Sequence, residues 1–80
     1  MEEFQVHYFN PHILLVVNTQ GMIRQLHTPV KVQCVQDTGI FKKGVFTYID
    51  LIGMEDSCVL VYFINGKAYR HSYFRIIANF

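Results

Sequence analysis

The sequence VLVYFINGKAYRH, at residues 59–71, decides the fold. An apolar run leads into Asn65-Gly66, and a second strand-like run follows it. Both central residues of a type I′ turn need a positive φ, which Asn tolerates and Gly adopts freely. We therefore expect a tight antiparallel hairpin that pairs residues 59–64 with residues 67–71.

Strand patterns continue on both sides of this hairpin. In residues 4–9 and 30–34 apolar side chains alternate with polar ones, which is the period-2 signature of a strand with one wet face. Residues 12–18 are apolar on both faces, and residues 45–51 and 75–77 also suit strands. The chain is therefore expected to consist mainly of short strands.

Short connections separate these strands. Asn10-Pro11 turns the chain, because the residue before a proline is kept out of the helical region. Residues 22–27 are too few for a stable helix, so we expect them to be extended. Residues 40–44 form a loop, and residues 72–74 form a single helical turn before the last strand.

The composition agrees with an all-β domain. Val, Ile, Thr, Phe and Tyr account for 33 of the 80 residues, whereas Ala accounts for two. A hydrophobic content of 51% with 16% charged residues excludes a disordered tail. A chain of this length forms one domain, which we expect to span residues 1–80.

Two of the expected strands, at residues 13–17 and 59–64, are apolar on both faces. A strand buried on one side shows alternation, so something must cover the second face. Either the N-terminal hairpin folds over the rest of the chain, or a second chain covers it. We expect a homodimer, because the hairpin is too small to cover all of this surface. The candidate interface residues are Ile13, Leu15, Val17, Val59, Val61 and Phe63.

The net charge of +1 is far from the strongly basic balance of proteins that bind nucleic acid mainly by neutralising phosphates. A nucleic-acid site must therefore be a local patch, in which cations track the backbone and exposed rings stack on bases. The residues that could form it are Phe41, Lys42, Lys43, Lys67, Tyr69, Arg70, Tyr73 and Arg75. The alternative reading places Tyr69 and Phe74 in the core and leaves the lysines to keep a loop tip soluble.

The sequence gives little support to catalytic, metal or cofactor sites. His71 and Ser72 are adjacent, so a strand would point them to opposite faces. Four histidines include one pair near a turn, His7 and His12, with no third ligand close by. The five glycines occur singly and form no phosphate-binding loop. We expect no catalytic residue, no cofactor, no metal and no small-molecule substrate.

The longest uninterrupted apolar run, at residues 13–17, is far shorter than the roughly 20 residues of a membrane-spanning helix. The chain opens with Met1-Glu2-Glu3, whose charge is opposite to that of a secretory signal. We expect a soluble, cytoplasmic protein that contacts no membrane. Cys34 and Cys58 have neither redox nor metal spacing, so we expect both to be buried.

Three runs of the chain resemble the small SH3-like barrel proteins of bacteriophages and prophages. They are VKVQCVQD at 30–37, FKKGVFTYID at 41–50 and VYFINGKAYRHSYFRII at 61–77. The residues that match the pattern of those proteins are Cys34, Phe46, Ile49, Asp50, Gly66, Tyr69, Phe74 and Ile77. Phe46 stands where an aromatic hydroxyl is usual, and Gly44 is displaced by one position.

This resemblance implies a small SH3-like barrel of five to six mainly antiparallel strands over residues 30–80, with residues 1–29 as an added N-terminal hairpin. It also implies a non-catalytic phage-type accessory protein that binds and modulates or inhibits a bacterial host protein in the host cytoplasm. Nucleic-acid binding through the basic and aromatic residues named above is the alternative function.

Overall fold

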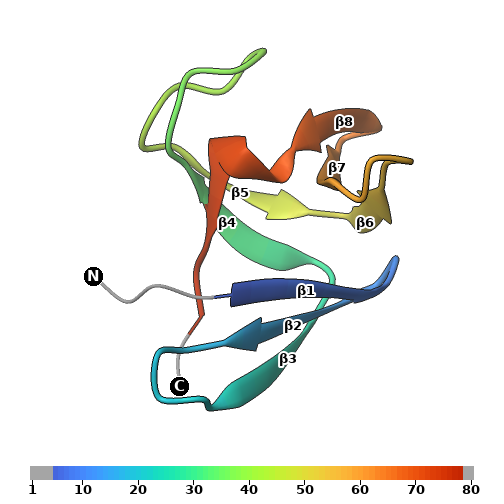
Figure 1. Ribbon diagram of the computed structural model, residues 1–80. Helices are drawn as coiled ribbons and strands as arrows, with labels where there is room; N and C mark the ends of the chain where they lie inside the picture. Colours follow the sequence, from blue (N-terminus) through green and yellow to red (C-terminus); the bar gives the residue numbers. More distant parts are fainter. Residues whose placement is uncertain (1–4, 79–80) are drawn as a thin grey trace.

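The computed structural model describes residues 5–78, which form nine strands and one turn of 3-10 helix (Figure 1). The elements are β1 (Gln5–Asn10), β2 (Ile13–Val17), β3 (Ile23–His27), β4 (Val30–Cys34), β5 (Phe46–Ile49), β6 (Leu51–Met54), β7 (Leu60–Ile64), β8 (Lys67–Arg70), the 3-10 turn η1 (His71–Tyr73) and β9 (Phe74–Ile76). The all-β class predicted from the sequence is confirmed. Phe4, which was expected to open the first strand, lies outside the described residues. Within residues 5–78 no helix has the length and apolar character needed to cross a membrane.

The strands lie in three antiparallel sheets of three strands each, in the orders β1-β2-β3, β5-β4-β9 and β6-β7-β8 (Figure 1). Among the described strands, the hydrogen-bonded ladders do not join into the closed barrel expected from the sequence. The run expected as one strand at residues 45–51 is divided at Asp50, so that β5 pairs with β4 and β6 pairs with β7. The Asp50 N–H donates to the Phe63 carbonyl at 2.8 Å where the chain leaves one sheet for the next.

The β7–β8 hairpin has the predicted turn. Ile64 pairs with Lys67, and Asn65 and Gly66 between them have φ values of +51° and +81°. The Asn65 N–H donates to Asp50 Oδ2 at 2.9 Å, which ties the turn to the bend between β5 and β6. The hairpin predicted from Asn65-Gly66 is confirmed, and the helical turn expected at residues 72–74 is present one residue earlier, as η1.

The N-terminal region is a three-stranded sheet, which corrects the expectation of a two-stranded hairpin. The extended segment expected at residues 22–27 forms β3, which pairs with β2 over its whole length. The buried Asn18 side chain stabilises the β2–β3 turn, because its Oδ1 accepts hydrogen bonds from the N–H groups of Gln20 and Met22, each at 2.9 Å. These local side-chain hydrogen bonds stabilise the β2–β3 turn, which lacks the Asn-Gly pair of the β7–β8 turn.

One hydrophobic core contains side chains from all three sheets. Leu14 and Val16 of β2 have no exposed surface and belong to the same core as residues of β4, β6 and β7. The Ile52 N–H of β6 also donates to the Pro11 carbonyl in the β1–β2 turn at 2.8 Å. The chain itself therefore covers the inner face of β2, and the N-terminal sheet is part of the fold.

Candidate functional site

Exposed aromatic and basic side chains share the outer face of the β5-β4-β9 sheet. Alternate residues of β4, from Val30 to Cys34, are buried, so the residues between them point outward. On β5, Phe46 and Tyr48 are each 52% exposed, whereas Ile49 is fully buried. On β9, the residue between two buried positions also points outward. The set that we call the aromatic face consists of Lys31, Gln33, Phe46, Tyr48 and Arg75.

Strand register arranges the aromatic face in two rows. In the first row Gln33 of β4 pairs with Phe46 on one side and with Arg75 on the other. In the second row Lys31 pairs with Tyr48. Phe46 and Tyr48 are two residues apart on the same strand, so their side chains leave the same face from backbone positions roughly 6.8 Å apart along β5. The two rings therefore lie in line along β5, beside the Lys31 and Gln33 side chains of β4.

Direct side-chain contacts hold this arrangement. The Lys31 Nζ lies 5.0 Å from the centroid of the Phe46 ring, within the range of a cation–π interaction. Arg75 Nη2 donates to Gln33 Oε1, and Gln33 Nε2 donates to the Gly44 carbonyl at 3.2 Å. Gln33 thus holds the Arg75 guanidinium and lies between Arg75 and Phe46 in the first row.

The electrostatic balance of the aromatic face is positive, because it holds one Lys, one Arg and no carboxylate. Two carboxylates lie on the adjoining segments, and both have partners. Asp50 accepts the Asn65 N–H, and Asp37 accepts the Lys43 N–H at 2.7 Å and lies 3.9 Å from the Lys42 Nζ. The Asp37 charge is therefore paired with that of Lys42, whereas Asp50, at the end of β5, keeps its negative charge because its Asn65 partner is a neutral N–H.

Exposed rings can stack on planar groups, and the cations beside them can neutralise phosphates or carboxylates. No family model, curated protein or solved structure matches this chain. The chemistry of the aromatic face is therefore interpreted from its side chains.

Of the eight residues expected to form a nucleic-acid patch, one lies in the aromatic face, Arg75. Phe41 is buried and makes edge-to-face contacts with Tyr69 and Phe74, at ring-centroid distances of 5.4 and 5.7 Å. Tyr69 and Tyr73 are half-buried and pack against the core. For Tyr69 and Phe74, the alternative reading that placed them in the core is confirmed.

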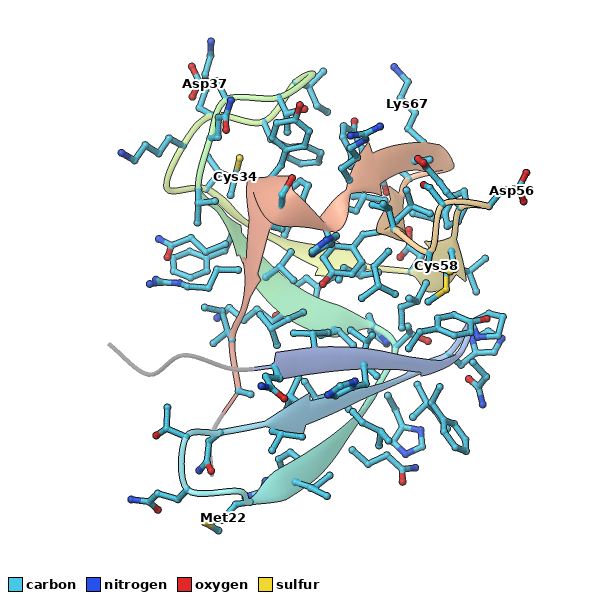
Figure 2. All side chains as sticks on the ribbon, in the orientation of Figure 1. Met22, Cys34, Asp37, Asp56, Cys58 and Lys67 are labelled. Atoms are coloured by element: carbon cyan, nitrogen blue, oxygen red, sulfur yellow. The ribbon has the colours of Figure 1, made fainter. Side chains whose placement is uncertain are left out.

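The four remaining cations of the expected patch are exposed but divided between two places. Lys42 and Lys43 lie in the loop before β5, whereas Lys67 and Arg70 lie on β8 in another sheet. Figure 2 shows Lys67 projecting into solvent beyond β8. The structure does not bring these eight residues together as one patch.

Sequence reasoning missed Lys31, Gln33, Phe46 and Tyr48 as site residues. The signal that could have found them is the pairing of two alternating runs, KVQ in β4 and FTY in β5. Once Val32 is assigned to the core, its neighbours must face outward, and so must the residues that pair with them. The four side chains then fall on one face.

The six candidate interface residues also fall on two different sheets. Ile13, Leu15 and Val17 are half-buried on the outer face of the N-terminal sheet, and the other three lie on or beside β7. Val61 is buried, at 8% exposed, and Phe63 is half-buried. These residues therefore do not form one continuous surface.

The cysteines differ in environment, which corrects the expectation that both are buried. Cys34 is buried in the core, and its Sγ donates to the Gln36 carbonyl at 3.0 Å. Cys58 is exposed in the loop before β7, and both thiols are free. Figure 2 shows the two residues well apart. Within the described residues, no three His, Cys, Asp or Glu side chains are grouped to hold a metal ion.

Proposed function

We propose that this protein is a non-catalytic binding module of SH3-like topology whose aromatic face binds single-stranded nucleic acid. The order of elements after Pro29 supports the SH3-like part of the proposal. A strand, a long loop, a strand bent at Asp50, a tight hairpin, a 3-10 turn and a final strand follow one another, and the first and last strands pair. The order of strand, loop, strand and hairpin agrees with the order of the sequence runs that carry the resemblance.

The observation that carries the functional proposal is the exposure of Phe46 and Tyr48 side by side, each at 52%. Large aromatic side chains are usually buried, so two adjacent exposed rings on a sheet need a reason. Successive bases of an extended single strand can stack on such rings, at about 1–3 kcal/mol per base. A duplex keeps its bases paired and stacked, so we expect it to bind less well.

The basic residues add a smaller, salt-dependent contribution. Lys31 and Arg75 can contact about two phosphates, which predicts a slope near −1.4 in a plot of log K against log salt for a single strand. Gln33 between them offers an amide that can bond to the edge of a base. Binding is therefore expected to depend more on stacking than on charge, in agreement with the net charge of +1.

Fluorescence anisotropy with a labelled oligothymidine across a salt series tests this proposal. We expect saturable binding with a shallow salt slope, weaker binding of a duplex of the same length, and a loss of affinity in Phe46→Ala and Tyr48→Ala. Lys31→Ala should weaken binding, whereas Lys67→Ala, which removes an exposed cation from another sheet, should not. Absence of saturable binding, or equal effects of the two lysine variants, would contradict it.

A protein partner, such as a bacterial host protein bound in its cytoplasm by a phage-type accessory protein, is the second candidate. Tyr, Phe and Arg are enriched at protein interfaces, and the aromatic face holds all three types. Leu51 and Met54 of β6, in the neighbouring sheet, also have exposed apolar side chains. Nucleic acid ranks first because Lys31 lies against the Phe46 ring and the five residues of the aromatic face include two cations and no acid. If no oligonucleotide binds, capture of one bacterial protein that Tyr48→Ala abolishes would support the second candidate.

A further inference from the structure

Among the strands of residues 5–78, β3 is an edge strand. Its hydrogen-bonded neighbour is β2, and it lies at the margin of the molecule away from the other two sheets (Figure 1). All residues of β3 except Leu26 are exposed, Ile23 to 67%. Met22, which precedes the strand, is 51% exposed and projects from the same margin (Figure 2). Such an edge presents backbone N–H and C=O groups to any strand that can pair with it.

The register identifies the backbone groups that face the open edge. The Asn18 N–H donates to the Met22 carbonyl at 3.0 Å, and the Thr28 N–H donates to the His12 carbonyl at 2.8 Å. Met22 and Thr28, on either side of β3, therefore bond to the residues that flank β2. In an antiparallel ladder, hydrogen-bonded pairs alternate with pairs that are not bonded, so the even-numbered residues of β3 also bond to β2. The residues whose backbone groups point away from β2 are Ile23, Gln25 and His27.

We propose that a second copy of this chain pairs with β3 in antiparallel orientation about a two-fold axis at Gln25. Gln25 then pairs with the partner's Gln25, and Ile23 pairs with the partner's His27. In each pair both residues have outward backbone groups, so the edge is complementary to itself. The two N-terminal sheets join into one sheet of six strands.

The charge on β3 is low enough to allow a second copy as the occupant. The strand holds one residue from the set Lys, Arg, Asp and Glu, which is Arg24. Pairing about Gln25 places Arg24 opposite the partner's Leu26, so like charges do not face each other directly. The strand also has no Lys, Pro or bulge of the kind that blocks edge pairing in many proteins.

The pairing also covers Ile23, an exposed residue beside the apolar surface noted in the sequence. Val17 pairs with Ile23 on the outer face of the sheet, and Ile23 is covered when the partner strand is added. Leu15 and Ile13 then belong to one continuous outer face shared by both copies. A ladder of five residues makes a small interface, so we expect a dimer that dissociates on dilution.

Sedimentation equilibrium over a series of rising protein concentrations tests the proposal. The mass of the wild-type protein should rise from 9.4 kDa toward twice that value. Gln25→Pro removes the outward N–H but no β2–β3 hydrogen bond, because proline is tolerated where an edge N–H faces solvent. This variant should stay at the monomer mass. The matched control Gln25→Val keeps the N–H and should associate as the wild type does.

Circular dichroism and urea denaturation check that each variant is folded. If Gln25→Pro loses its strand signal, Ile23→Lys replaces it, because a charge on the edge opposes pairing without changing the backbone. A wild-type mass that remains at 9.4 kDa at every concentration overturns the proposal. So does a folded edge variant that associates as strongly as the wild type.

Discussion

Two glycines of this chain are restricted for different reasons. Gly66 has φ of +81° and no heavy atom within 4 Å of the position of a Cβ, so its backbone conformation alone restricts it. A Cβ at Gly53 would lie 2.8 Å from the Phe63 ring, so Gly53 is restricted by space. The turn between β7 and β8 thus depends on conformation, whereas the close pairing of β6 and β7 depends on a missing side chain.

Substitution of Gly66 tests the conformational restriction. Gly66→Val should lower the free energy of unfolding by about 1–3 kcal/mol, because a β-branched residue is strained at positive φ. Gly66→Asn should cost less, since Asn tolerates the left-handed region. Urea denaturation of both variants measures the difference. Equal stability of Gly66→Val and the wild type would contradict the turn assignment.

Tyr62 makes stability depend on alkaline pH. Burial raises the pKa of its phenol well above the ordinary value of 10.0. The unfolded chain releases this proton near pH 10, whereas the folded protein keeps it. The contribution of the buried Tyr62 side chain to stability is therefore fully present below pH 10. As pH rises above 10, stability should fall by up to about 1.4 kcal/mol per pH unit. Urea denaturation from pH 8 to 11 should show a smaller fall for Tyr62→Phe than for the wild type, and parallel curves would refute the assignment.

At the scale of elements, the apolar strand β2 has one face in the core and the other partly exposed to solvent. Leu14 and Val16 are fully buried, whereas Ile13, Leu15 and Val17 are half-buried on the outer face. Polar side chains of the neighbouring strands flank this outer face, since Leu15 pairs with His7 on β1 and Gln25 on β3. The surplus of apolar residues seen in the sequence is therefore partly absorbed inside the chain.

A matched pair of leucine variants tests this division. Leu14→Ala should lower the free energy of unfolding by about 2–5 kcal/mol, because it leaves a cavity in the core. Leu15→Ala should cost clearly less, since its side chain is half-exposed. Urea denaturation at a low protein concentration, where association is absent, gives both values. An equal cost for the two variants would contradict the inward orientation of Leu14.

The local sequence pattern predicted where the strands lie better than it predicted which strands pair with each other. Alternation and Asn65-Gly66 identified most of the strands and the β7–β8 hairpin, because these depend on nearby residues. The β3 run IRQLH has no alternation of apolar and polar residues, so its role as a third strand follows from pairing with β2. Phe41 lies in a loop that its bridge with Thr38 closes. Its ring contacts Tyr69 and Phe74, which are far away in the sequence, so no local pattern predicts its burial.

At the scale of the whole molecule, three sheets share one core, and the outer face of the β5-β4-β9 sheet carries two exposed rings. The division of strands at Asp50 turns β5 toward β4, and this pairing gathers the aromatic face. Sequence spacing could not predict the face, since Lys31, Phe46 and Arg75 are brought together by long-range pairing. The proposed dimer edge lies on the N-terminal sheet, so binding and association use different surfaces.

Chemical-shift mapping in solution tests the central claim most directly. A ¹⁵N-labelled sample is titrated with unlabelled oligothymidine, and the amide shifts of every residue are followed. The proposal predicts saturable changes centred on Lys31, Gln33, Phe46, Tyr48 and Arg75, with little change at Lys67 or in β3. Saturable shifts centred on another surface, or no shifts at all, would contradict the assignment of the aromatic face as a site for single-stranded nucleic acid.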